Sequence, residues 1–205
     1  MITGKKVVAL EARLKHCKNV VTLGVRPNLS DYSAGEADLN RNAEKIYYPT
    51  TYYAELLDAM GKKTFPSYHN YKCVHDKIKQ TALFYLIEIP HPRTRVFYGT
   101  RQKNSICDRF KFPFIAKIPR GSAMGRGVYL IRSQKDLDAY IKLSNVAYIQ
   151  EYLPSDRDMR VVIIGDLEVH AYCRIAPSDE FRSNVAVGAS LSLYPVPKNA
   201  LDLAR

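Results

Sequence analysis

The sequence predicts a small α/β unit with a parallel sheet over residues 1–71, followed by a mixed α+β unit over residues 72–205. Two observations support this prediction. Short apolar runs alternate with helical patterns in the first seventy residues, which is typical of parallel β-α units. The second half contains two apolar runs separated by Gly165-Asp166, a two-residue hairpin signal. A chain of 205 residues is long enough for two such units.

Three strands and two helices are expected in the first unit. Apolar runs predict its strands at Val7–Leu10, Val20–Leu23 and Lys45–Tyr48. Asp31–Asn42 predicts a weak helix with Ser30 as its cap, and Tyr52–Met60 predicts a second helix that Gly61 ends. Residues 65–71, which are rich in tyrosine, indicate a linker. The unit contains no Gly-x-Gly-x-x-Gly, so nothing supports a dinucleotide site there.

The second unit begins with a helix and continues mainly in strands. Apolar residues at helical spacing predict the helix, namely Ile78, Ala82, Leu86 and Ile89. Asp76 is expected in its first turn, and Pro90 ends it. The predicted strands are Thr94–Tyr98, Phe114–Ile118, Val128–Ile131, Val146–Tyr152, Met159–Ile164 and Leu167–Cys173. Ser133 and Asp136 start a further helix with Leu137 and Tyr140 on one face.

Composition narrows the function classes. The net charge is +11, from 31 Lys and Arg against 20 Asp and Glu, which favours polyanionic partners. A basic, solvated surface is the alternative interpretation. Cys17, Cys73, Cys107 and Cys173 form no Cys-x-x-Cys pair, which predicts free thiols in a cytoplasmic protein. No apolar run reaches the 18 residues of a membrane span.

Lys117 and the glycines that follow it are the leading site candidate. Lys117 lies in the apolar strand Phe114–Ile118, where an ammonium group requires an anionic partner. Gly121, Gly125 and Gly127 follow within ten residues, and glycines allow backbone amides to approach phosphate oxygens closely. The alternative is a lysine at a strand edge followed by a flexible hairpin.

The order of these two features decides between nucleotide folds. A Walker A loop requires Gly-x-x-x-x-Gly-Lys-Ser/Thr, and the chain has no such run. In protein kinases the glycine loop precedes the lysine strand, whereas here it follows. A lysine strand followed by a glycine hairpin is the order found in ATP-grasp proteins.

Further motifs follow in the order that the RimK-like ATP-grasp family requires, and residues 72–205 resemble that family. They are the helix segment His75–Gln80 with its exit Ile89–Thr94, the hinge Tyr148–Pro154, the step Asp158-Met-Arg160, and Phe181-Arg-Ser-Asn184 with Gly188. The resemblance implies an ATP-grasp fold, incomplete at its C-terminus, preceded by a Rossmann-like pre-ATP-grasp unit.

The resemblance also implies a role for each matching residue. Lys77 and Lys117 would neutralise the α- and β-phosphates of ATP. The lid over the triphosphate would be formed by Gly121, Ser122, Gly125, Arg126 and Gly127. Adenine would be met by Glu151, Tyr152 and Leu153, and the ribose hydroxyls by Asp158. Arg174 and Arg182 would be catalytic at the γ-phosphate or acyl-phosphate, with Ser183 and Asn184 beside them.

Residue alternation in the strand Leu167–Cys173 bears on Arg174. Apolar Ala171 and Cys173 alternate with polar His170 and Tyr172, so Arg174 is expected on the polar side of the strand. A solvent-facing arginine is the alternative interpretation.

Metal-binding elements are missing from the family pattern. ATP-grasp ligases hold Mg²⁺ with an acidic strand residue and a later Glu-x-Asn, and no Glu-x-Asn occurs in this sequence. The sequence stops at Arg205, inside the helix that begins near Pro197, so we expect a fragment of a longer protein. His69, Cys73 and His75 form a weaker metal candidate without an evident fourth ligand.

The leading functional hypothesis is the ATP-binding part of an ATP-dependent carboxylate–amine ligase acting through an acyl-phosphate. Its expected cofactors are ATP and Mg²⁺, and its expected partners are a carboxylate, an amine, an acidic peptide and a second copy of the chain. A non-catalytic nucleotide-binding module is the first alternative. An RNA-binding protein, suggested by the charge and by 15 tyrosines, is the second.

Overall fold

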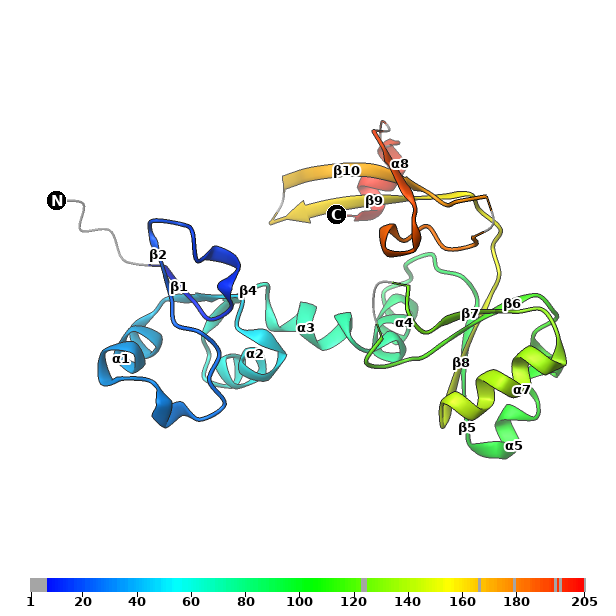
Figure 1. Ribbon diagram of the computed structural model, residues 1–205, viewed down its shortest axis with the longest axis horizontal. Coiled ribbons are helices and arrows are strands. Elements are labelled where there is room, and N and C mark those ends of the chain that lie inside the picture. The colour runs from blue at the N-terminus through cyan, green and yellow to red at the C-terminus, as the bar shows by residue number, and fades with distance from the viewer. Residues whose placement is uncertain are drawn as a thin grey trace. The chain divides into compact units, whose positions relative to one another are not determined.

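The computed structural model describes residues 7–122, 125–165, 167–178, 180–193, 195 and 197–204, with residues 167–169 described by their backbone alone. It divides the chain into two compact units, Met1–Val74 and His75–Arg205 (Figure 1). The division falls three residues later than the boundary expected after Tyr71, because a helix continues to Val74.

A parallel sheet forms the centre of the first unit, as the alternating pattern predicts. Its strands are β1 (Val7–Ala9), β2 (Val20–Thr22), β3 (Lys45–Tyr47) and β4 (Lys63–Phe65). They lie in the order β2-β1-β3-β4, and each neighbouring pair is parallel. The strand β4 was not predicted, since three residues with two polar side chains show no apolar period.

The helices of this unit correct two predictions. They are η1 (Ala12–Leu14), η2 (Leu29–Asp31), α1 (Ala34–Asn42), α2 (Thr50–Ala59) and α3 (Tyr68–Val74). The expected cap Ser30 is wrong: Ser33 caps α1, because Glu36 three residues later completes a capping box. The linker predicted over residues 65–71 is also wrong, since it holds the end of β4 and most of α3.

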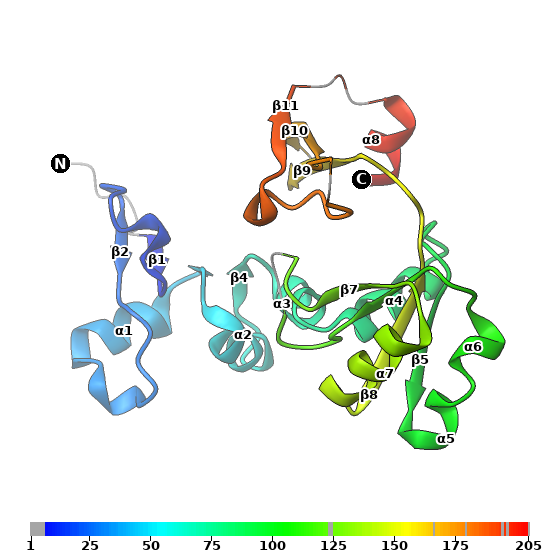
Figure 2. The same ribbon diagram turned by 45° about the vertical axis from the view of Figure 1, so that its right-hand side comes forward.

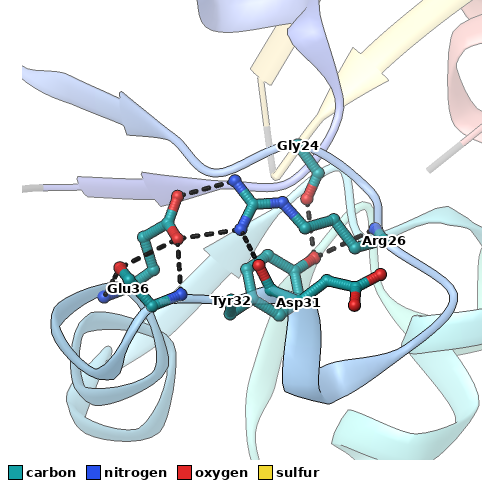
Figure 3. Close-up of polar contacts among 6 residues, drawn as sticks. Gly24, Arg26, Asp31, Tyr32 and Glu36 are labelled. Carbon is teal, nitrogen blue, oxygen red and sulfur yellow. Dashed lines mark hydrogen bonds and ion pairs between the residues drawn. The ribbon is translucent and has the colours of Figure 1, made fainter.

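Arg26 orders the loop between β2 and α1 (Figure 3). Its guanidinium donates to both carboxylate oxygens of Glu36 at 2.8 Å and to the Asp31 carbonyl at 2.6 Å. The Tyr32 hydroxyl donates to the Gly24 carbonyl at 2.7 Å. The hydrogen bonds from Arg26 and Ser33 lower the pKa of Glu36 to about 2. The strand-to-helix turn is therefore fixed by an ion pair whose carboxylate also completes the capping box of α1.

The core of the first unit lies between its strands and α2. Val8 and Ile46 from the strands are buried against Tyr53 and Leu57 of the helix. The spacing of Tyr53 and Leu57 by four residues places both on one face of α2.

A second, antiparallel sheet forms the centre of the second unit. Its strands are β5 (Thr94–Tyr98), β6 (Phe114–Lys117), β7 (Val128–Ile131) and β8 (Val146–Glu151), in the order β5-β8-β6-β7. Helix α7 (Gln134–Leu143) begins at the predicted cap Ser133. Leu137 and Tyr140 of α7 are buried against Phe114 and Ala116 of β6, which places a core on one face of the sheet.

Three helices precede or interrupt these strands. They are α4 (Lys77–Leu86), α5 (Gly99–Lys103) and α6 (Ile106–Arg109). Asp76 is the N-cap of α4 and does not lie in its first turn; its carboxylate accepts from the backbone N–H groups of Ile78 and Lys79 at 3.0 and 3.1 Å. The helices α5 and α6 were not predicted, because each is shorter than the window in which a helical period is detectable.

The end of the described chain forms a smaller sheet and one helix (Figure 2). Its elements are β9 (Arg157–Ile164), β10 (Leu167–Ile175), η3 (Val185–Val187), β11 (Ser190–Ser192) and α8 (Lys198–Ala204). The predicted hairpin is confirmed by the antiparallel pairing of Ile164 with Leu167, although Asp166 lies outside the described residues. None of the described helices has the length and apolar character that crossing a membrane requires.

Candidate functional site

The strand register of the central sheet gathers polar side chains on the face opposite the α7 core. Gln150 of β8 is paired with both Thr94 of β5 and Ile115 of β6. Lys117 is paired with Tyr148. Residues directly opposite one another, and residues two positions apart, share a face of an antiparallel sheet. Thr94, Gln150, Lys117 and Tyr148 therefore lie on one face.

Lys117 is held on this face by a neutral partner. Its Nζ donates to Oε1 of Gln150 at 2.6 Å and lies 5.9 Å from the centre of the Tyr148 ring. Burial, and next the positive charge of Lys77, lower the pKa of the Lys117 ammonium group. The Tyr140 hydroxyl donates to the Lys117 carbonyl at 2.6 Å and so fixes the end of the strand from the core side.

Lys77 approaches the same place from the first turn of α4. Its Nζ donates to the backbone carbonyl and to the hydroxyl of Ser122, both at 3.0 Å. Burial lowers its pKa as well. Among the described residues, neither Lys77 nor Lys117 forms an ion pair. The hydrogen-bond partners of the two lysines are neutral, so they orient the side chains but leave their positive charge unbalanced.

The glycine loop joins this lysine pair to a distant segment of the chain. Gly121, Gly125 and Gly127 have φ values of +68°, +78° and +67°, and residues 123 and 124 lie outside the described part. A Cβ atom at Gly125 would lie 2.8 Å from Oδ1 of Asn184, so only glycine fits this contact. Arg126, between Gly125 and Gly127, is exposed.

A cavity of about 250 Å³ opens beside Lys117. Its lining includes Lys117, Gln150, the hinge residues Glu151, Tyr152 and Leu153, and Arg182 and Asn184. The Glu151 carboxylate accepts from the backbone N–H of Arg93 at 2.6 Å, so its side chain is occupied in joining β8 to β5. The hinge therefore offers the cavity its backbone groups together with the side chains of Tyr152 and Leu153.

Arg174 and Arg182 are each bound to a carboxylate. Arg182 donates to Glu180 through Nε at 2.9 Å and Nη2 at 2.5 Å, and through Nη1 to the Gly125 carbonyl at 3.1 Å. Arg174 donates to both oxygens of Asp158 at 2.7 and 2.5 Å. Its side chain is 15% exposed, so the solvent-facing alternative is wrong. The α- and β-phosphates separate the ribose of ATP from its γ-phosphate, so the roles implied for Asp158 and Arg174 require this pair to open.

The structure thus brings most implied site residues together. The lysines, the glycine loop, the hinge, Arg182 and Asn184 meet around one cavity or contact one another, and Ser183 is half-buried between the last two. Gln150 and Thr94 were missed. Gln150 lies inside the recognised hinge motif, and its polar side chain in an otherwise apolar strand was the available signal; Thr94 could be found only from strand pairing.

The described residues do not offer a metal site. Within the ranges that the structure describes, no three side chains of His, Cys, Asp or Glu gather closely enough to hold an ion, and this includes His69, Cys73 and His75. Of the acidic side chains in this region, Glu151 accepts from the Arg93 backbone, and Asp158 and Glu180 are paired with Arg174 and Arg182. We therefore assign no step through Mg²⁺ to the side chains that the structure describes.

Curated proteins of known name are similar to this chain in sequence. The chain is 31% identical over 179 residues, 83% of its length, to the glutamate–LysW ligase ArgX of Sulfolobus acidocaldarius, of which the match covers 63%. It is also 32% identical to a probable α-L-glutamate ligase of Pseudoalteromonas atlantica. That match covers 63% of this chain and 46% of the relative. The chain thus spans less than two thirds of these relatives.

Two solved structures share the fold at low identity. A RimK domain ATP-grasp protein from Sphaerobacter thermophilus gives a TM-score of 0.60 at 18% identity, over 81% of this chain and 71% of that one. D-alanine–D-alanine ligase from Bacillus anthracis gives a TM-score of 0.63 at 11% identity, over 95% of this chain and 68% of that one. The family model for the RimK-like ATP-grasp domain matches residues 74–204. The chain belongs to the RimK-like ATP-grasp family.

Proposed function

We propose that the second unit binds ATP in the cavity beside Lys117. We further propose that it is the ATP-binding part of an ATP-dependent carboxylate–amine ligase. One observation carries the proposal: Lys77 and Lys117 are both half-buried, and both are held by neutral acceptors. A polyphosphate would supply the missing negative charge. The hinge beside them lines the same cavity with Tyr152 and Leu153, whose aromatic and apolar side chains suit a base.

The remaining site residues take roles along the nucleotide. Tyr152, Leu153 and the backbone of Glu151 would meet adenine, and Asp158 the ribose. The loop Gly121–Gly127, with Ser122 and Arg126, would close over the phosphates. Arg174 and Arg182, with Ser183 and Asn184 beside them, would stabilise the transferring phosphoryl group by charge and position, without covalent catalysis.

The reaction we propose has two steps. A substrate carboxylate attacks the γ-phosphate of ATP, which forms an acyl-phosphate and releases ADP. An amine then attacks the acyl carbon, forms the amide and releases phosphate. Since relatives are named as glutamate ligases, glutamate is the first substrate to test. The net charge of +11 favours an acidic peptide as its partner.

Thermal unfolding with and without ATP and Mg²⁺ tests the nucleotide site. A ligand present at a hundred times its Kd stabilises the folded state by about 2.7 kcal/mol. Wild-type protein should gain a raised Tm, and Lys117→Ala should lose most of that gain. Equal ATP stabilisation in both proteins would exclude Lys117 from the site. RNA in place of ATP is the control for binding by charge alone, because such binding weakens steeply with salt.

A non-catalytic nucleotide-binding module is the second candidate. It is favoured by the lack of an acidic cluster among the described side chains, since phosphoryl transfer depends on metal-bridged phosphates. ADP release measured with glutamate and acidic peptides separates the candidates. ATP binding without substrate-dependent ADP release would support the module.

A further inference from the structure

We propose that Gln150, oriented by Thr94, is the positioning residue that aims the Lys117 ammonium group into the cavity and keeps it charged without neutralising it. The inference rests on the proposed ATP site and identifies a determinant of it that lies one strand away from the lysine. Two hydrogen bonds across neighbouring strand pairs, and a third within the segment that leads into β5, carry it.

Hydrogen-bond polarity is fixed from one end of this chain of bonds. The Pro92 carbonyl can only accept, so the Thr94 hydroxyl uses its single proton to donate to it, at 2.7 Å. Thr94 Oγ1 is then left as an acceptor, and Nε2 of Gln150 donates to it at 2.8 Å. The amide is thereby oriented with Oε1 toward Lys117 Nζ, at 2.6 Å.

The opposite amide orientation is excluded by its consequences. Rotating the Gln150 amide by half a turn would place an N–H donor 2.6 Å from an ammonium group that only donates. It would also place an oxygen beside Thr94 Oγ1, whose proton is engaged with Pro92. Two bonds would be lost, each in a half-buried place where an unmade hydrogen bond costs more than in water.

The strand register makes this arrangement rigid. Thr94 and Gln150 are direct partners in the β5–β8 pair, and Gln150 lies diagonally across from Lys117 in the β6–β8 pair. Pro92, Lys117 and Gln150 all line the 250 Å³ cavity. The orientation of the lysine is thus determined by the sheet and not by the loop that follows it.

The chemistry explains why an amide suits this position better than a carboxylate. A neutral Oε1 accepts one N–H of Lys117 and leaves the net positive charge, and the other N–H groups, for an anion. A glutamate here would neutralise the lysine and repel phosphate. The other ionisable groups around Lys117 are Lys77, which repels it, and Tyr148, whose hydroxyl is bound to Thr81. Glu151 accepts from the backbone N–H of Arg93, and Arg182 is paired with Glu180.

The pKa of Lys117, measured without ATP, tests the inference directly. The rate of Lys117 acetylation is followed against pH by mass spectrometry in wild type, Thr94→Val, Thr94→Ser and Gln150→Glu. Thr94→Val keeps the β-branched shape but removes the acceptor that orients Gln150, so the pKa should fall below that of Thr94→Ser. Gln150→Glu should move the pKa in the opposite direction, which damage to the fold would not do. Equal values in both Thr94 variants would overturn the inference.

ATP affinity supplies the second measurement. We expect ATP to bind Thr94→Val about fivefold more weakly than Thr94→Ser, the loss typical of one hydrogen bond. Gln150→Glu should bind at least tenfold more weakly, although its lysine is more fully protonated. Gln150→Glu binding as tightly as wild type would overturn the inference. If wild type binds no ATP, the proposed function fails, while the acetylation profiles still decide whether Gln150 sets the state of Lys117.

Discussion

The lysines and the arginines of the candidate site differ in the partners that hold them. Lys77 and Lys117 donate to a backbone carbonyl, a hydroxyl and an amide, all uncharged. Arg174 and Arg182 are bound to the carboxylates of Asp158 and Glu180. The lysines, on α4 and β6, therefore present net positive charge, whereas each arginine is already neutralised by its neighbour.

This difference assigns the two pairs different tasks. Charge that no carboxylate balances attracts an anion before any rearrangement, so the lysines are suited to the first capture of phosphates. The arginines must exchange a carboxylate for a phosphate, or share it, and this exchange offsets much of the gain. ATP affinity should consequently depend more on the lysines than on Arg174.

The largest effect on ATP affinity is expected from breaking the lysine pair. Lys77→Met should weaken ATP binding roughly 30-fold, since hydrogen bonds to charged groups contribute about 1.5–3 kcal/mol. Arg174→Met should weaken it less than about fivefold, because the arginine is already paired. Isothermal titration calorimetry measures the ATP affinity of both variants. Lys79→Met is the matched control, as Lys79 is exposed on the same helix. A larger loss from Arg174→Met than from Lys77→Met would reverse the comparison.

The glycine loop contacts one member of each pair, Lys77 through Ser122 and Arg182 through Gly125, and a matched pair of glycines tests its contact with the neighbouring Asn184. Gly121→Ala introduces a Cβ at φ +68° into open space, whereas Gly125→Ala introduces one at φ +78° only 2.8 Å from Asn184 Oδ1. We expect Gly121→Ala to reduce the free energy of unfolding by about 1 kcal/mol through backbone strain alone. Gly125→Ala should lose about 2 kcal/mol or more.

Urea denaturation measures both losses, and a second substitution identifies the cause. Asn184→Ala in the Gly125→Ala background removes the side chain that the new Cβ meets, so it should recover the excess over Gly121→Ala. If the excess remains, the contact with Asn184 is not its source, and the loop does not meet this segment as described.

Breaking the Arg174–Asp158 pair should cost more stability than breaking the lysine pair. Arg174→Met leaves a carboxylate without its partner and should cost about 1 kcal/mol, a value reduced by solvent because Asp158 is 42% exposed. Lys77→Met removes the repulsion of Lys117 but also two hydrogen bonds to Ser122, so its effect on stability should be smaller than that of Arg174→Met. A double-mutant cycle with Asp158→Asn isolates the coupling energy in chemical denaturation. Coupling near zero would show that the pair is not formed in solution.

The comparison also shows what the sequence could and could not predict. The strand of Lys117, the glycine loop, the cap Ser133 and the hinge motif are local patterns, and each was recognised from consecutive residues. The partners of the charged groups were not recognised. Asp158 with Arg174 and Thr94 with Gln150 are 16 and 56 residues apart and become neighbours only through strand pairing.

Errors in the fold have the same physical origin on a smaller scale. Ser30 and Ser33 are both followed by possible first turns, and only the Glu36 carboxylate, also engaged by Arg26, decides between them. The strand β4 and the helices α5 and α6 have three to five residues each, so tertiary contacts and not periodicity define them. Ile106 and Phe110 illustrate this, because both are buried in the core of the central sheet.

The smallest expected effect is a difference in the pH at which each pair influences stability. Hydrogen bonds from Arg182 lower the pKa of Glu180, so its contribution is present above its unfolded pKa and is lost as the pH falls through its folded value. Burial lowers the pKa of Lys117, so between its folded and unfolded values the unfolded state holds more protons and stability rises with pH. Denaturation at pH 3–6 and pH 8–10.5 should therefore show the gap between wild type and Glu180→Gln closing in acid. In alkali, wild type should gain stability relative to Lys117→Met. Gaps that stay constant over both ranges would mean that neither group has the surroundings described, and the contrast between lysines and arginines would not hold in solution.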